Sequence, residues 1–227
     1  MKKNERAAAI VRTIVVSLIA VLFVVPLVWM VLSSLKTAPE VFARPFHWLP
    51  AKAQWQNYAT VWMNEEASML RAFANTLYIA LFSIIGQMFI SSLAAYSFAK
   101  INFKGKQVVF MLFLSSMMVP SQLTIIPRFM LFKTIGLYNN LWAIILPAFF
   151  GATSIFMLRQ FYMGLPNDLI EAAKIDGAGH LRIFLRIMLP LTKAALMSLI
   201  ILAFISSWNE YMAPLIFLVK KELYTVS

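Results

Sequence analysis

Residues able to do bond chemistry are few in this 227-residue chain, and their spacing argues against catalysis. There is no cysteine, which excludes a thiolate nucleophile and a thiolate metal site. The two histidines, His47 and His180, lie far apart in sequence and give no metal-ligand spacing. Three carboxylates, Asp168, Glu171 and Asp176, share one short segment, but no base or nucleophile accompanies them. We therefore expect no catalytic residue, no metal site and no enzyme activity in this chain.

The segment that holds these carboxylates, residues 166–190, is predicted to form a helix, a sharp turn and a second helix. Pro166 and Asn167 suit the start of a helix, and the acidic residues after them suit its first turn. Gly177 and Gly179 are expected to break this helix, because glycine adopts backbone angles that other residues avoid. The helical spacing that follows predicts an apolar face made of Leu181, Phe184, Leu185 and Met188.

The same segment resembles the EAA loop of ABC-importer permeases, whose pattern is Glu-Ala-Ala, three residues, Gly, nine residues, Ile-x-Leu-Pro. The matching positions, with an extended Asp-Gly-Ala, are Glu171, Ala172, Ala173, Asp176, Gly177, Ala178, Ile187, Leu189 and Pro190. The resemblance implies a coupling helix that docks in a groove on an ATP-binding subunit, with Glu171 meeting a basic group there. The alternative is an ordinary amphipathic loop on another kind of membrane protein.

The composition indicates a membrane protein built from helices. Hydrophobic residues make up 61% of the chain and charged residues only 13%, against about a quarter in soluble domains. The net charge of +11 fits basic residues that flank apolar spans better than a nucleic-acid surface. We expect an all-α polytopic bundle forming a single permease domain, residues 1–227, with a cytoplasmic loop at 159–190. The predicted spans are residues 10–32, 72–99, 108–130, 141–158 and 191–219.

The distribution of Lys and Arg predicts that the N-terminus is cytoplasmic. With this orientation, the inner segments carry 12 basic residues and the outer segments carry 8. The first apolar run is too long for a signal peptide and is expected to remain as a span. Permeases that resemble this chain usually have six spans. Because only five spans are predicted here, we expect this sequence to lack the last transmembrane helix.

Polar residues inside spans are candidates for the substrate pathway, because such groups are costly in lipid. The candidates are Asn75, Gln87, Ser115, Gln122, Asn209 and Glu210. For each of them, hydrogen bonding between helices is the alternative role. Glu210 either faces a water-filled cavity or lies at the outer interface beside Trp208 and Tyr211.

The chain is most similar to the carbohydrate-type branch of these permeases. The similarity is carried by residues 34–37, 48–50, 57–58, 75–76, 136–137 and 208–211. It implies a subunit that forms half of the substrate pathway of an ATP-driven importer for a sugar or oligosaccharide in a bacterial inner membrane. The implied partners are a second permease, two ATP-binding subunits and an extracytoplasmic solute-binding protein.

No phosphate-binding Gly-x-x-x-x-Gly-Lys-Ser/Thr loop occurs in the sequence, so ATP and Mg are expected in a partner subunit and no cofactor in this chain. An importer for amino acids, peptides or ions is the alternative within the same class. A passive channel or scaffold protein and a membrane-embedded enzyme are alternatives from other classes.

Overall fold

The computed structural model describes residues 2–63 and 68–227. Every regular element in that part of the chain is helical, and it contains no strand, which agrees with the predicted all-α class. The chain divides into two compact units, Met1–Glu65 and Glu66–Ser227, which are described separately below.

The first unit is built on one long apolar helix, α1 (Lys2–Ser34), which contains the predicted span 10–32. Pro26 lies inside this helix without ending it. Apolar side chains along it are widely exposed; Phe23, for example, is 73% exposed. A helix that is apolar all round suits a bilayer as its surroundings. Two short helices, α2 (Ala38–Val41) and α3 (Gln56–Met63), follow it.

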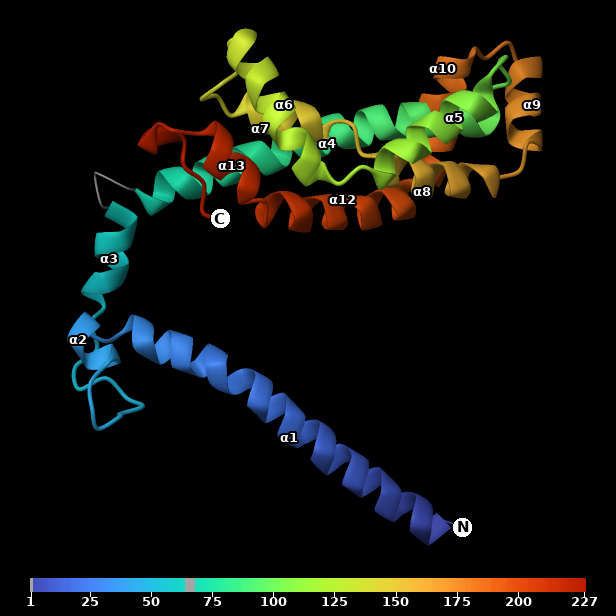
Figure 1. Cartoon of the computed structure of the whole chain (residues 1–227). Coiled ribbons are helices and arrows are strands. Elements are labelled where there is room, and N and C mark those ends of the chain that lie inside the picture. The colour runs from blue at the N-terminus through green and yellow to red at the C-terminus, as the bar shows by residue number, and fades with distance from the viewer. Residues whose placement is uncertain (1, 64–67) are drawn as a thin grey trace. The chain divides into compact units, whose positions relative to one another are not determined.

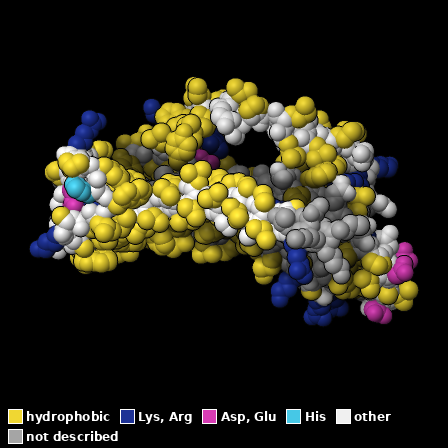
Figure 2. All heavy atoms as spheres, turned by 90° about the horizontal axis from the view of Figure 1, so that it is seen from below, with side chains coloured by type: hydrophobic (Ala, Val, Ile, Leu, Met, Phe, Trp, Pro, Cys, Tyr) yellow, Lys and Arg dark blue, Asp and Glu magenta, His cyan; other side chains and the backbone are white. Residues whose placement is uncertain are grey.

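Hydrophobic side chains also predominate on the face of the molecule drawn in Figure 2. A largely apolar outer surface is expected of a protein that crosses a membrane.

The second unit is organised around its longest helix, α4 (Met69–Lys100), which packs mainly against α8, α12 and α7 (Figure 1). The other α-helices of the unit are α5 (Lys106–Ser115), α6 (Ser121–Thr134), α7 (Trp142–Ala148), α8 (Ala152–Met163), α9 (Asp168–Ile175), α10 (His180–Ile183), α11 (Leu189–Leu191), α12 (Lys193–Trp208) and α13 (Met212–Phe217). Short 3-10 turns cover Ser116–Met118 and Lys221–Leu223, and a π-helical turn covers Phe184–Met188.

Two hydrophobic clusters hold this unit together, one toward each end of α4. The cluster near Lys100 joins α4, α8 and the segment after α9, and its fully buried members include Leu158, Tyr162 and Met188. The other joins the first half of α4 to α7 and α13 and includes Ile145 and Phe217. Together the two clusters anchor α4 from Ile79 to Ala99.

By length and composition, three helices of the described chain could cross a membrane: residues 8–34, 69–100 and 142–163. In two further pairs of helices, the two members are long and apolar enough to cross a membrane only when they are taken together, and each pair is bent. The predicted number of five spans corresponds to counting each bent pair as one span.

The predicted third span, residues 108–130, is bent by 98° between its two helical halves. The break falls at Pro120, which directly precedes α6, because a proline excludes the helical conformation from the residue before it. Pro127, in contrast, lies inside α6. The second bent pair comprises residues 180–191 and 193–208, with an angle of 77° between them, so it begins inside the predicted loop 159–190. The predicted fifth span, residues 191–219, extends beyond it, since α12 ends at Trp208 and α13 begins at Met212.

Candidate functional site

The segment that resembles a coupling loop begins with α9. Asp168 and Glu171 lie in its first turn, where a negative charge interacts favourably with the positive end of the helix dipole. Gly177 follows the helix with a φ of +77°, and the Ala178 N–H donates to the Ala173 carbonyl at 2.9 Å. The predicted break at Gly177 is confirmed, because glycine adopts this left-handed conformation without a steric penalty.

One face of α9 is packed and the opposite face is open. Ile170 and Ala173 are buried, so Ala173 belongs to the core of this chain rather than to its surface. Glu171 and Ala172 are exposed, and Ile175 is 87% exposed. Ile175 was missed in the sequence, although its place four residues after Glu171 puts both on one helix face.

The predicted apolar face of the second helix is wrong at two of its four positions. Phe184 and Met188 are buried, whereas Leu181 and Leu185 are exposed. The π-helical turn at Phe184–Met188 is wound more widely than an α-helix, so a spacing of 3.6 residues does not describe its faces. Of the remaining positions of the family pattern, Asp176 and Pro190 are exposed, and Ala178, Ile187 and Leu189 are half-buried.

Hydrogen bonds tie the loop firmly to the end of α4. The Lys100 ammonium donates to the Leu165 carbonyl and to the Asn167 side-chain oxygen, both at 2.6 Å. The Tyr96 hydroxyl lies 3.4 Å from His180 Nδ1, at the start of α10. The loop and α4 are therefore connected both before α9 and after it.

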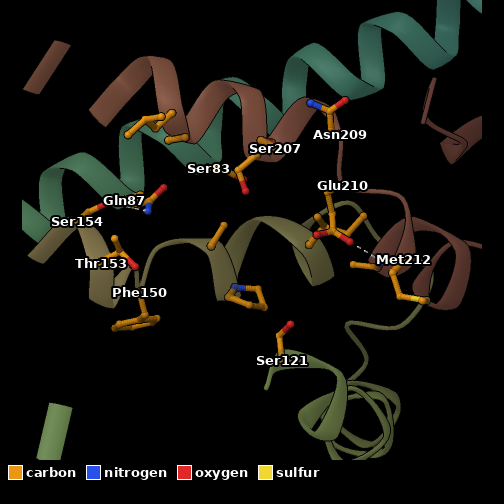
Figure 3. A pocket seen from close by; sticks show the side chains of 18 of the residues that line it. Ser83, Gln87, Ser121, Phe150, Thr153, Ser154, Ser207, Asn209, Glu210 and Met212 are labelled. Carbon is orange, nitrogen blue, oxygen red and sulfur yellow. Dashed lines mark hydrogen bonds between the residues drawn. The ribbon is translucent and has the colours of Figure 1, made fainter. Parts of the chain in front are cut away.

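A cavity of about 720 Å³, lined by both polar and apolar side chains, lies in the same unit (Figure 3). Residues of α4, α6, α7, α8 and α12 and the segment after α12 line it. Its polar side chains are Ser83, Gln87, Ser121, Gln122, Arg128, Thr153, Ser154, Ser206, Ser207, Asn209, Glu210 and Tyr211. Most of them are hydroxyls and amides, which donate and accept hydrogen bonds without carrying charge.

Gln87 of α4 is positioned in this cavity by a close helix contact. Its Nε2 donates to the Ser154 hydroxyl of α8 at 3.1 Å (Figure 3). Gly151, directly before α8, lies so close to Gln87 Nε2 that a Cβ at this position would overlap it. A glycine at 151 therefore allows Gln87 to occupy its place.

The cavity lining contains one acidic side chain, Glu210, and one basic side chain, Arg128. A carboxylate oxygen of Glu210 accepts the Ala213 N–H at 3.0 Å, near the start of α13. The Arg128 guanidinium lies 5.1 Å from the centre of the Phe217 ring, and its buried Nε has no hydrogen-bond partner. Within the described residues, no three His, Cys, Asp or Glu lie close enough to hold a metal ion.

Four of the six predicted pathway residues line this cavity: Gln87, Gln122, Asn209 and Glu210. The other two do not line it. The Asn75 amide donates to the carbonyls of Glu222 and Tyr224 at 2.8 and 3.0 Å, which attaches the last residues to α4. The Ser115 hydroxyl donates to the Leu112 carbonyl at 2.7 Å within its own helix.

Arg128 was not predicted as a cavity residue. From the sequence, we interpreted it as a basic residue at the outer end of a span, beside Pro127. The signal that could have found it is a cation in the middle of α6, where the apolar surroundings make an unpaired charge costly.

Comparison with known proteins identifies relatives over nearly the whole chain. Residues 87–225 match the family described as "Binding-protein-dependent transport system inner membrane component". The arabinooligosaccharides transport system permease protein AraQ of Bacillus subtilis is 34% identical over 216 residues, which are 94% of this chain and 76% of the relative. The diacetylchitobiose uptake system permease protein NgcG of Streptomyces coelicolor is 32% identical over 213 residues, 93% of this chain and 69% of the relative. The sn-glycerol-3-phosphate transport system permease protein UgpE of Yersinia enterocolitica is 33% identical over 181 residues, 78% of this chain and 64% of the relative.

A solved structure has the same fold. A chain of a bacterial ABC transporter involved in the import of the acidic polysaccharide alginate superimposes with a TM-score of 0.85, covering 97% of this chain and 77% of that chain at 24% identity. This confirms the predicted permease fold. The apolar helices and the relatives agree on a multi-pass inner-membrane protein whose part in transport is not enzymatic. The chain is therefore a permease subunit that belongs to the family of binding-protein-dependent transport system inner membrane components.

Proposed function

We propose that this subunit forms half of the substrate pathway of an ATP-driven importer for a sugar or oligosaccharide, and that residues 166–190 couple it to an ATP-binding subunit. The partners in this proposal are a second permease, two ATP-binding subunits and an extracytoplasmic solute-binding protein. ATP and Mg are bound by the partner subunit, and this chain supplies the pathway and the docking surface.

The observation that carries the coupling role is that α4 connects the loop to the cavity. Lys100 at its end holds the loop, and Gln87, thirteen residues earlier, lines the cavity. Thirteen residues of helix span about 20 Å. A displacement of the loop is thus transmitted to the cavity wall through one continuous, well-packed helix, as in rigid-body switching between two states.

The surface of α9 supports docking of this helix on a partner. Glu171, Ala172 and Ile175 are exposed together, which combines a charge, a small residue and an apolar side chain. Insertion of a short helix into a groove uses such a face, with the apolar residue providing buried area and the charge providing orientation.

Two observations support a sugar as the substrate. Among the polar side chains of the cavity lining, most are hydroxyls and amides, and these groups suit the many hydroxyls of a saccharide. The relatives AraQ and NgcG are named for arabinooligosaccharides and diacetylchitobiose.

An anionic polyol phosphate is the second candidate substrate. Arg128 in the cavity has a free buried Nε, and the relative UgpE is named for sn-glycerol 3-phosphate. A guanidinium is suited to binding phosphate oxygens. Glu210 in the same lining opposes an anion, so we place this candidate second.

The orientation that we propose has the N-terminus in the cytoplasm, together with residues 105 and 177. Its support is the excess of Lys and Arg in these segments. Because the chain has no cysteine, single cysteines at positions 105, 177 and 55 can be labelled with an impermeant reagent in intact cells. We expect only position 55 to react from outside, and labelling at 177 would contradict the orientation.

The coupling role is tested by Glu171→Lys in the complete transporter. We expect normal amounts in the membrane, loss of ATP-dependent uptake and weaker retention of the ATP-binding subunits on purification. Lys104→Glu is the matched control, because it also reverses the charge of an exposed side chain near the same end of α4. Uptake is measured with an arabino-oligosaccharide, diacetylchitobiose and glycerol 3-phosphate.

The outcomes separate substrate from coupling. If the unmodified complex takes up neither sugar in an ATP-dependent way, the sugar assignment fails. If it does take up sugar but Glu171→Lys behaves like Lys104→Glu, the importer assignment stands and the docking role of α9 fails.

A further inference from the structure

The segment after α1 in the first unit folds back along α1, and it does so through specific contacts. We call residues 42–50 the return loop. The chain after the loop is tied to the end of α1, because the Asn57 amide donates to the carbonyls of Ser34 and Lys36 at 2.9 Å. The two flanks of the loop are also joined to each other, since the Ala51 N–H donates to a carboxylate oxygen of Glu40 in α2 at 2.6 Å.

A buried lysine holds the return loop against the helix. Lys36 is only 3% exposed, and its ammonium donates to the His47 carbonyl at 2.5 Å. The same ammonium lies 4.5 Å from the centre of the Trp29 ring and 5.9 Å from that of Phe46. These contacts satisfy the cation by a carbonyl and by aromatic faces rather than by water, as is suitable close to lipid.

Three aromatic rings join the return loop to the last turns of α1. The ring centres of Trp29 and Phe46 are 4.8 Å apart, those of Phe46 and Trp48 are 5.3 Å apart, and those of Trp29 and Trp48 are 5.8 Å apart. Tilted and edge-to-face rings at these distances attract one another. The side chain of Trp48 is therefore fixed beside α1.

Trp48 also closes a groove along α1. The position of this groove along the helix shows how deep in the membrane it lies. The groove holds about 350 Å³ and is lined by Ala20, Val21, Val24, Val25, Val28 and Trp48. At 1.5 Å per residue, Val28 and Ala20 lie about 9 and 21 Å below the end of α1 at Ser34. The 27-residue apolar part of α1, Ala8–Ser34, is about 40 Å long and exceeds a hydrocarbon core of about 30 Å by about 5 Å at each end. The groove then begins inside the hydrocarbon region.

The outward side of the return loop is apolar as well. Leu49 is 70% exposed, Phe46 is 55% exposed and Trp48 is 49% exposed. These side chains continue the exposed apolar surface of α1, which crosses the membrane, while Arg44 and Lys52 flank them on both sides. Aromatic rings with basic neighbours are typical of the boundary between lipid and water.

We propose that residues 46–49 insert into the membrane leaflet at the C-terminal end of α1, and that a phospholipid acyl chain occupies the groove between Trp48 and α1. The lining of alanine, valine and indole offers an acyl chain apolar contact and presents no charged group. The inference requires only that α1 crosses the membrane, and it holds or fails independently of the substrate and the coupling role.

The insertion is tested with spin labels in the complete transporter, reconstituted in vesicles of phosphatidylethanolamine and phosphatidylglycerol. Leu49→Cys carries one label, and Trp55→Cys is the matched control, because Trp55 is 69% exposed and lies outside the return loop. We expect the label at 49 to collide with oxygen and to be shielded from a water-soluble nickel chelate. We expect the label at 55 to collide with the chelate. Equal access of the chelate to both labels would overturn the insertion.

The occupant of the groove is tested by tryptophan fluorescence in vesicles that contain phosphatidylcholine with dibrominated acyl chains. Trp48→Phe should remove a distinct part of the lipid-dependent quenching, and Trp55→Phe should remove much less. If Trp48→Phe leaves the quenching unchanged, protein rather than lipid covers the groove, and the proposal fails.

Discussion

Replacement of Gly177 by valine isolates the contribution of one backbone conformation to the coupling loop. Gly177 has a φ of +77°, and a Cβ built there meets no atom within 4 Å. The penalty is therefore a backbone penalty alone, about 1–2 kcal/mol for a side chain in the left-handed region. Such a free energy shifts the balance between the formed and the opened turn by roughly 5- to 30-fold.

The chain provides a matched control two residues later. Gly179 also has no atom within 4 Å of a built Cβ, but its φ is −72°, which any residue adopts. Gly177→Val and Gly179→Val thus differ in backbone strain and not in packing. Only the first should weaken the turn.

Limited proteolysis measures this shift directly. In membranes washed free of ATP-binding subunits, trypsin should cut after the exposed Lys174 and Arg182, which lie on either side of the turn. When opening is fast relative to cleavage, the cleavage rate follows the opened population. We expect cleavage of Gly177→Val to be roughly 5- to 30-fold faster than that of Gly179→Val, with a parallel loss of uptake. Equal cleavage rates for the two variants would refute the argument from backbone strain.

Two further predictions concern the docking face and the cavity. Ile175→Asp should leave the amount in the membrane unchanged, because this side chain is 87% exposed, but should weaken binding of the ATP-binding subunit roughly 10- to 100-fold if Ile175 is buried on docking, as measured by co-purification. Gly151→Ala should displace Gln87 and break its hydrogen bond to Ser154, so we expect a raised KM for uptake with little change in membrane amount; an unchanged KM would argue against Gln87 as a pathway residue.

The local features of the coupling loop could be predicted because they depend on neighbouring residues. The acidic first turn of α9 and the left-handed turn at Gly177 follow from dipole and backbone preferences within a few residues. The buried and exposed positions of the helix after Gly179 could not be predicted in the same way. Its π-helical turn buries Phe184 and exposes Leu185, and a fixed helical period does not reveal such a change of winding.

The roles of the polar residues in the spans depended on packing between distant segments. Asn75 and Gln87 both carry amide side chains and both lie on α4. Asn75 nevertheless donates to the carbonyls of residues 222 and 224, whereas Gln87 lines the cavity. Nothing in their immediate sequence distinguishes them. The place of Arg128 in the cavity likewise depends on how α6 packs against α13, which lies 80 to 90 residues further along the chain.

The amino-acid sequence alone determined the membrane class, the helical content and the coupling segment, because hydropathy and turn preferences act over one span or one turn. Only the tertiary structure decided which polar groups share a cavity and that the return loop lies along α1. These features arise where helices and loops from separate parts of the chain come into contact, and side-chain packing and hydrogen bonding at those contacts set them.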